Sequence, residues 1–523
     1  MSLSIESIAL NRLAFGPSDS DLAHIQKLGL RRWVKEQLAP DATDGDDCLR
    51  RLNQATFRIH YGAGKDYPAL DESRSLATLN LPIQDIWHLT DNKLPLAGQE
   101  RTRPRVDVAS ATIIRAIYSP WQLKEVLCDF WHNHFSVNAS DTPVAVALPS
   151  YDRDVIRPHC FGNFRELLES VASSTAMLYF LNNRSSRAGF ANENYARELF
   201  ELHGLGRENY LNEFYNRWRD VPGALKSRPI GYIDQDVYEA ARAFTGWTVE
   251  DGSSLGGNDH LPSTGKFVYV ESWHDSYQKR VLGIEFDPFQ TALADGRKVL
   301  DLVANHPATA EYICKKLCRR LVSDNPSKEV ISGAADVWQK SVSKSDQIRQ
   351  VVEFIALSDE FSKSWGEKVK RPLELVASYV RATGIEFLPT EGLLGEIEAA
   401  GQRLFTWPSP TGNPDDKTYW LSTNAMRRRW SLIMGVTDNW WKTGLFEPSG
   451  QMSGNISTVG QATHFWFKRL LGTAPDQQMI STILEGLGLA AGHSFDSNKH
   501  GESDKLLRHI IAFIAMSPEF QLK

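Results

Sequence analysis

Two histidines in the segment 131–135, Trp-His-Asn-His-Phe, are the side chains best suited to chemistry. Neutral imidazole is a common ligand of transition metals, and histidine exchanges a proton near neutral pH. In a regular helix His132 and His134 point about 200° apart, whereas an extended or frayed helix end places both on one side. We predict that at least one binds a metal ion or acts as an acid or base, with Asp129 and Asp141 as carboxylates that could orient an imidazole. The alternative is one buried structural histidine and one exposed histidine.

A second group of candidates lies in the segment 191–206, ANENYARELFELHGLG. Glu193 and Arg197 are four residues apart and share one face of a predicted helix, and Glu198 lies on the neighbouring face. These carboxylates could bind the metal ion, and Arg197 could bind an anionic group of a substrate. The alternative is an ordinary solvated helix face, because Glu–Arg pairs at this spacing contribute only roughly a few tenths of a kcal/mol.

A third histidine, His274, follows a strand-like run and precedes an aspartate. It is a candidate third ligand or oriented base, and the alternative is an ordinary turn pair. Arg242 and Trp247 could line the same pocket and contact the substrate. The predicted metal ligands are His132, His134, Glu193, Glu198 and His274, and the predicted catalytic residues are these five and Arg197.

An aromatic loop in residues 401–430 is the candidate surface for a sugar. Three prolines at positions 408, 410 and 414 forbid a regular helix before residue 416. Trp407 and Trp420, together with Tyr419, could stack on sugar rings. We therefore expect an envelope or extracellular glycan as the first substrate to test.

Composition excludes several classes of protein. The chain has 523 residues, 58 basic and 64 acidic side chains and a net charge of −6, so it has no overall charge for binding nucleic acid. It contains no run of about 18 apolar residues, and we expect no membrane span. Phosphate-binding glycine loops, GxSxG elbows and HExxH motifs are missing from the sequence, which argues against NTPases, α/β hydrolases and zincins. The five cysteines are too sparse for a disulfide framework and are expected to be buried free thiols.

The first residues lack the basic opening and apolar core of a signal peptide. We therefore expect a cytoplasmic protein, or one that is exported in complex with a partner that carries an export signal.

Helical periodicity dominates the chain and predicts a mainly α fold, one large multi-helix body with a small β-hairpin insertion. We divide it into a helical lead segment at residues 1–40, a polar linker or wrap at 41–105, a main helical domain at 106–384 and a C-terminal helical region at 385–523. Short β-branched and aromatic runs separated by glycines place the insertion at about 247–284.

The sequence contains one internal repeat. Residues 348–361, IRQVVEFIALSDEF, match residues 507–520, LRHIIAFIAMSPEF, and each is an apolar helix ended by a Ser-x-Glu-Phe turn. They represent either a duplicated helical unit or one packing solution used twice.

Several motifs together resemble the bacterial domain-of-unknown-function 1800 family across nearly the whole chain. They are LNRLAFGPSDSDL at 10–22, FWHNHF at 130–135, ANENYARELFELHGLG at 191–206, DVYEAARAFTGW at 236–247, WHDSYQKRVLG at 273–283, NHPATAEYICKKL at 305–317 and VKRPLELVASYVRATG at 369–384. The resemblance implies a largely helical protein, often exported, often paired with a sulfatase-like partner, and with no settled reaction. The loop PSPTGNPDD lacks the Gly-Trp-Pro step typical of that region.

Three functions stay open at this point. The first is a divalent-metal-dependent enzyme, hydrolytic or oxidative, that acts on an envelope or extracellular polymer. The second is a non-catalytic helical scaffold for the sulfatase-like partner. The third is a carbohydrate-binding protein.

Overall fold

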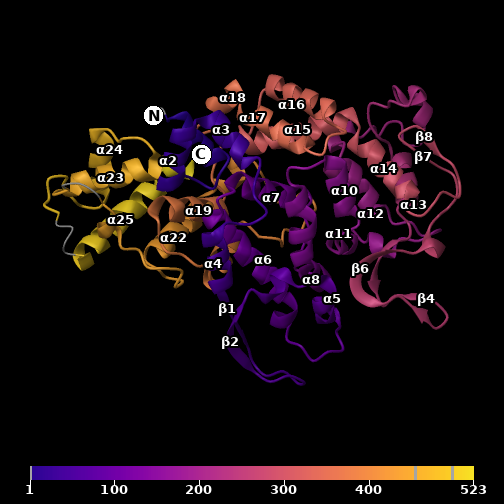
Figure 1. Ribbon diagram of the computed structural model, residues 1–523, viewed down its shortest axis with the longest axis horizontal. Coiled ribbons are helices and arrows are strands. Elements are labelled where there is room, and N and C mark those ends of the chain that lie inside the picture. The colour runs from indigo at the N-terminus through magenta and orange to yellow at the C-terminus, as the bar shows by residue number, and fades with distance from the viewer. Residues whose placement is uncertain (1–2, 453–455, 496–499) are drawn as a thin grey trace.

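The chain folds into a mainly α-helical structure, which confirms the predicted fold class (Figure 1). The computed structural model describes residues 3–452, 456–495 and 500–523. Residues 1–2 of the predicted lead segment, and residues 453–455 and 496–499 of the predicted C-terminal region, lie outside the described residues. None of the helices in the described ranges combines the length and hydrophobicity needed to cross a lipid bilayer.

Three helices lie in the first part of the described chain: α1 (Ile5–Arg12), α2 (Asp19–Leu28) and α3 (Leu30–Gln37). The hydroxyls of Ser4 and Ser18 accept hydrogen bonds from the first turns of α1 and α2, which is the usual role of serine at a helix N-cap.

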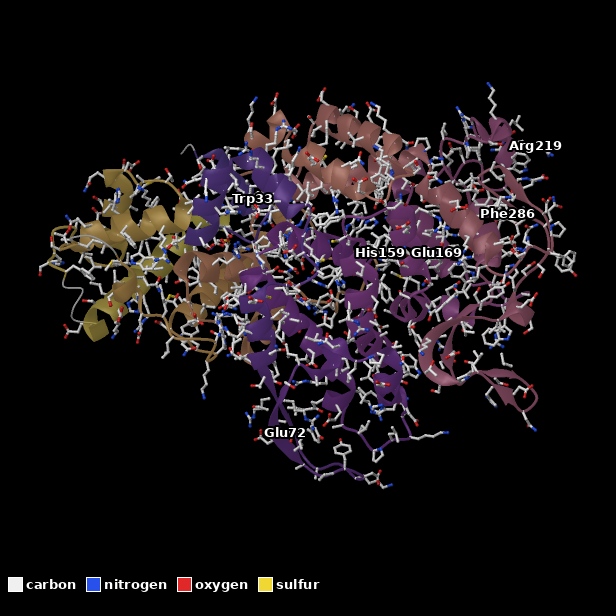
Figure 2. All side chains as sticks on the ribbon, in the orientation of Figure 1. Trp33, Glu72, His159, Glu169, Arg219 and Phe286 are labelled. Carbon is white, nitrogen blue, oxygen red and sulfur yellow. The ribbon has the colours of Figure 1, made fainter. Side chains whose placement is uncertain are left out.

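The segment predicted as a linker, residues 41–105, contains regular structure. It holds α4 (Asp46–Gln54) and an antiparallel pair of strands, β1 (Thr56–Tyr61) and β2 (Leu70–Ser75). Figure 2 shows Glu72 on this projecting hairpin and Trp33 of α3 inside the body, where its side chain is buried.

The central helices carry the first candidate residues. They are α6 (Gly98–Tyr118), α7 (Gln122–His134), α8 (Thr142–Ser150), the π-helical turn η3 (Tyr151–Ile156), α9 (Arg157–His159), α10 (Phe164–Ala172), α11 (Thr175–Phe180), α12 (Glu193–Glu198), the π-helical turn η5 (Leu199–His203) and α13 (Asp234–Ala243). In Figure 1, α7 lies between the lead helices and α8.

A small β region lies between α13 and α14 (Ala294–Ala304). It consists of three antiparallel pairs made by β3 (Trp247–Asp251) with β6 (Ser263–Tyr269), β4 (Ser254–Gly256) with β5 (Asp259–His260), and β7 (Lys279–Val281) with β8 (Ile284–Phe286).

Helices then continue to the end of the described chain. They are α14 (Ala294–Ala304), α15 (Pro307–Leu321), α16 (Lys328–Lys340), α17 (Gln347–Ala356), α18 (Asp359–Ser362), α19 (Pro372–Thr383), α20 (Glu391–Ala399), α21 (Lys417–Trp420), α22 (Thr423–Thr437), α23 (Val459–Leu471), α24 (Gln477–Gly486), α25 (His500–Met516) and α26 (Pro518–Gln521). One hydrophobic core extends from Leu3 to Phe520 and so joins the lead helices to the C-terminal ones. All five cysteines are buried and free, as predicted.

The internal repeat belongs to two similar groups of helices, α15–α18 and α23–α26. Phe354 of α17 packs over Gly333 of α16, and Phe513 of α25 packs over Gly486 of α24. In each case a Cβ on the glycine would lie within 2.7 Å of the phenylalanine ring, so the two helices approach closely only because the residue is glycine.

Candidate functional site

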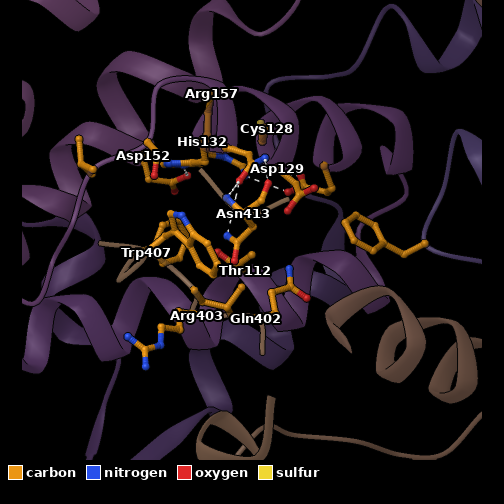
Figure 3. Close-up of a pocket in the computed structure, with 17 residues that line it drawn as sticks. Thr112, Cys128, Asp129, His132, Asp152, Arg157, Gln402, Arg403, Trp407 and Asn413 are labelled. Carbon is orange, nitrogen blue, oxygen red and sulfur yellow. Dashed lines mark hydrogen bonds and ion pairs between the residues drawn. The ribbon is translucent and has the colours of Figure 1, made fainter. Parts of the chain in front are cut away.

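His132 lies in the last turn of α7 and lines a small cavity between α7, η3 and the loop of residues 402–413 (Figure 3). The cavity volume is about 40 Å³, which is enough for one or a few water molecules. The polar residues that surround it include Asp129, Asn133, Asp152, Arg157 and Asn413.

Asp152 determines which ring nitrogen of His132 carries the proton. The Nε2 atom of His132 lies 2.9 Å from Oδ1 of Asp152, which is carried by the π-helical turn η3. Burial opposes ionisation of Asp152, but the hydrogen bond from His132 and the charges of Arg157 and Arg115 outweigh it and hold the pKa of this carboxyl below its ordinary value. A carboxylate only accepts hydrogen bonds, so Nε2 carries the proton and Nδ1 presents a lone pair when the ring is neutral. Nδ1 has no hydrogen-bond partner among the described residues.

Two aromatic rings hold the imidazole of His132 in place. Tyr151 and Phe405 meet it edge to face, with ring centroids 5.7 Å and 5.0 Å away. Figure 3 shows His132 beside Asp152, with Trp407 and Asn413 facing the same cavity. The orientation of His132 is therefore set by a carboxylate and by packing, as an acid–base catalyst requires.

The loop of residues 402–413 is fastened to the end of α7. The side-chain amide of Asn133 accepts a hydrogen bond from the backbone N–H of Asn413 at 2.7 Å and donates one to its carbonyl oxygen at 3.0 Å. Gly412 has φ +72°, and a Cβ there would lie 2.2 Å from the carbonyl oxygen of Asn133. Only glycine permits this approach.

The same loop brings two unsatisfied polar atoms to the cavity. Nε1 of Trp407 and Oδ1 of Asn413 are buried and have no hydrogen-bond partner within the described part of the chain. A buried polar atom without a partner costs about 1–3 kcal/mol. Both residues line the His132 cavity, which therefore has one donor and one acceptor that the described part of the protein does not satisfy.

His134, two residues along, has a different environment. Its ring is buried; Nε2 lies 3.2 Å from the carbonyl oxygen of His203, and Nδ1 lies 2.8 Å from Nζ of Lys316. Burial, followed by the charge of Lys316, holds the pKa of His134 well below its ordinary value. His134 is thus a neutral histidine with both ring nitrogens engaged, whereas His132 has one nitrogen free.

Arg197 of the predicted acidic helix forms ion pairs within α12 and with α13. Arg197 of α12 lies 3.3 Å from Glu193, four residues earlier, and 3.4 Å from Asp234 of α13. Glu193 is exposed, and burial followed by the charge of Glu201 raises the pKa of Glu198. None of the predicted residues of this helix lines the His132 cavity.

His274 belongs to another polar cluster. Its Nδ1 lies 2.9 Å from the carbonyl oxygen of Thr245, and its Nε2 lies 3.2 Å from Asp295, which also binds Lys279. No three His, Cys, Asp or Glu side chains within residues 3–452, 456–495 and 500–523 form a group that could hold a metal ion. The structure therefore does not bring the five predicted ligands together, and a divalent metal ion as cofactor stays a prediction.

The predicted substrate-binding residues are also separated. Arg242 forms a two-point ion pair with Asp275, at 2.8 Å and 3.0 Å, and Trp247 is buried in the core. Trp420 is buried and donates to the carbonyl oxygen of Pro414. Of the four predicted substrate-binding residues, Trp407 alone lines the His132 cavity.

Sequence reasoning missed Asp152 and Asn413 as members of the site. Asp129, which it named as an orienting carboxylate, instead pairs with Arg320 and Arg371. Nothing in the local sequence around Asp152 marks it, because its partner lies 20 residues away on another helix.

Comparison with known proteins gives one match. A family model described as a protein of unknown function (DUF1800) matches residues 8–522, essentially the whole chain. No curated protein and no solved structure matches.

Proposed function

The chain belongs to the family described as protein of unknown function (DUF1800), and we propose that it is a hydrolytic enzyme whose general base is His132. The observation that carries the proposal is the pairing of His132 Nε2 with a buried carboxylate while Nδ1 has no partner in the described structure. An aspartate that holds one ring nitrogen protonated leaves the other able to take a proton, and it stabilises the imidazolium that then forms.

The two unsatisfied atoms of the loop give the reacting water its orientation. Nε1 of Trp407 donates a hydrogen bond to the water oxygen, and Oδ1 of Asn413 accepts from one of its hydrogens. The second hydrogen passes to Nδ1 of His132 as the water oxygen bonds to the electrophilic centre of the substrate. The bond between the electrophilic centre and the leaving group then breaks, and the same proton moves from Nδ1 of His132 to the leaving group.

The size of the cavity restricts what enters it. At about 40 Å³ it admits the water and the reacting group, while the rest of the substrate stays outside. Tyr419 is 43% exposed and packs edge to face against Trp407, with ring centroids 6.1 Å apart. This exposed ring beside the cavity supports an envelope or extracellular polymer, such as a glycan, as the substrate class.

Replacement of His132 tests the proposal. Purified protein is assayed against a panel of glycosides, esters and polysaccharides, and the active substrate is then tested with His132→Gln, Asp152→Asn and the control His88→Gln, which changes an exposed histidine. We expect a loss of about 100-fold or more in kcat for His132→Gln, a smaller loss for Asp152→Asn and none for the control. Full activity of a folded His132→Gln protein would disprove the assignment.

Metal analysis of the same preparations tests the predicted cofactor separately. A divalent ion that copurifies with the unchanged protein and is lost in His132→Ala supports metal-dependent chemistry at this cavity. The sulfatase-like partner and the cellular location of the protein stay predictions.

Non-catalytic carbohydrate binding is a second candidate, and the exposed ring of Tyr419 favours it. In that case a glycan array detects binding that Tyr419→Ala removes and His132→Gln leaves unchanged. The two candidates are thus distinguished by which variant loses function.

A further inference from the structure

The second helical group, α23–α26, carries an open apolar groove. The groove has a volume of about 660 Å³ and lies between α22, α24 and the turn into α26. Its apolar walls include Trp430, Phe467, Met479, Ile483 and Phe513. Trp430 is 45% exposed and Phe513 is 37% exposed, so two large aromatic rings of the groove are open to solvent.

In the first helical group, a glutamate from the Ser-x-Glu-Phe turn binds the start of the neighbouring helix. Glu360 accepts hydrogen bonds from the backbone N–H of Ser327, at 2.9 Å, and from its hydroxyl. Ser327 is the N-cap of α16 and follows a proline. The bond from Ser327 to Glu360 therefore ties α16 to α18.

The second group replaces this hydroxyl with a carboxylate. Glu519 is the counterpart of Glu360 in the repeated turn, and the N-cap of α24, which also follows a proline, is Asp476. Asp476 uses one oxygen to cap α24 through the backbone N–H of Met479, at 2.8 Å. Two ionised carboxylates cannot hydrogen-bond to each other, so the bond from the Ser327 hydroxyl to Glu360 has no side-chain equivalent here.

The result is a groove with an acidic edge. Among the described residues that line the groove, Asp476 and Glu519 are the charged ones, and both are acidic. Glu519 has no hydrogen bond or ion pair to any residue that the structure describes. An occupant therefore has to satisfy two negative charges and cover an apolar floor at the same time.

We propose that this groove docks a peptide segment of a partner protein in which a lysine or arginine lies beside bulky apolar side chains. The apolar side chains fill the space between Trp430 and Phe513, and the basic group pairs with Asp476 and Glu519, as Ser327 does with Glu360 in the first group. The groove lies in the C-terminal helices, whereas the His132 cavity is formed by α7, η3 and the 402–413 loop. The proposal does not depend on the function assigned to His132.

Selection from a random 12-residue peptide library on the full chain tests the proposal. We expect the enriched peptides to carry a lysine or arginine next to bulky apolar residues, with affinity that falls as salt rises. Asp476→Asn with Glu519→Gln should weaken these peptides by about tenfold or more, since asparagine still caps a helix and the fold is retained. Glu485→Gln, an exposed change on the same helix α24, is the matched control and should leave affinity unchanged.

A second variant keeps the test independent of charge. Thr482→Trp places a large side chain in the groove from an exposed position of α24 and should block the same peptides. Failure to enrich any peptide, enrichment of peptides without a basic residue, or equal binding by the double charge variant would overturn the proposal. Self-association of the chain that Thr482→Trp abolishes would also overturn it, because a second copy would then be the occupant.

Discussion

The burial of His203 should lower the stability of the folded protein at acidic pH. Its ring is fully buried, and neither ring nitrogen has a hydrogen-bond partner in the described structure. Burial, followed by the charge of Lys316, lowers the pKa of His203 from 6.5 to about 3. The unfolded chain therefore binds a proton at this histidine below pH 6.5, whereas the folded chain does not until about pH 3.

Because the pKa of His203 is lowered in the folded state, the free energy of unfolding decreases as the pH falls. Stability is unaffected above the unfolded-state pKa and falls as the pH drops below it, by about 1.4 kcal/mol for each pH unit. At pH 5 the chain lies about 1.5 units below the unfolded-state pKa, so His203 costs the folded state about 2 kcal/mol there. His203→Leu removes the titrating group and retains a buried side chain of similar size.

Denaturation of the unchanged protein and His203→Leu at pH 7.5 and pH 5 measures this cost. We expect His203→Leu to gain about 2 kcal/mol relative to the unchanged protein between these two pH values, or roughly 2 °C in Tm for a chain of this length. Buried groups that His203 does not contact titrate in both proteins and cancel in the comparison. His88→Leu, at an exposed position, should show no such gain. The reasoning would be refuted if the stability difference between His203→Leu and the unchanged protein were the same at both pH values.

Three further changes give distinct outcomes. Gly412→Ala forces a Cβ against the carbonyl oxygen of Asn133 at positive φ, and we expect a loss of about 2 kcal/mol or more in thermal unfolding, together with faster proteolysis of the 402–413 loop. Glu374→Gln removes a buried carboxylate that binds several cations, including Lys523 at 2.8 Å, and should cost about 3–5 kcal/mol in chemical denaturation. Trp407→Phe removes the unsatisfied Nε1 donor together with the five-membered part of the indole, so we expect a loss of no more than about 1–2 kcal/mol in thermal unfolding but a tenfold or greater fall in kcat.

Local features were predictable from the sequence. The spacing of Glu193 and Arg197 predicted a shared helix face, and the structure places these two side chains 3.3 Å apart. The helical lead segment and the β insertion follow from periodicity, which needs only neighbouring residues. The hairpin of β1 and β2 was missed because its strands carry many polar side chains and its outer face is exposed, so the apolar alternation is weak.

Long-range features were not predictable in this way. The sequence identified His132 by residue type, but its partner Asp152 is brought to it by the π-helical turn η3, a widened helical turn that local pattern does not reveal. The pairing of Asn133 with Asn413 spans 280 residues and depends on how α7 packs against the aromatic loop. Such contacts are set by tertiary packing, which a single sequence does not display.

Asp129 connects the architecture to the chemistry proposed for His132. It lies three residues before His132 on α7, so both side chains project from neighbouring positions of the same helix. Asp129 pairs with Arg320 of α15, at 3.0 Å, and with Arg371 at the N-cap of α19. These ion pairs fix the rotation of α7 about its own axis. That rotation determines whether His132 can form its hydrogen bond with Asp152.

Asp129→Asn should therefore act through position and not through proton transfer. We expect a lower kcat without a shift in the pH profile, because the dyad of His132 and Asp152 is still present but less well aligned. Asp152→Asn should instead move the pH profile, since it removes the charge beside His132. A shifted profile for Asp129→Asn would mean that this carboxylate also sets the protonation of the site, by its charge or by proton exchange, and the division of roles between the two aspartates would be wrong.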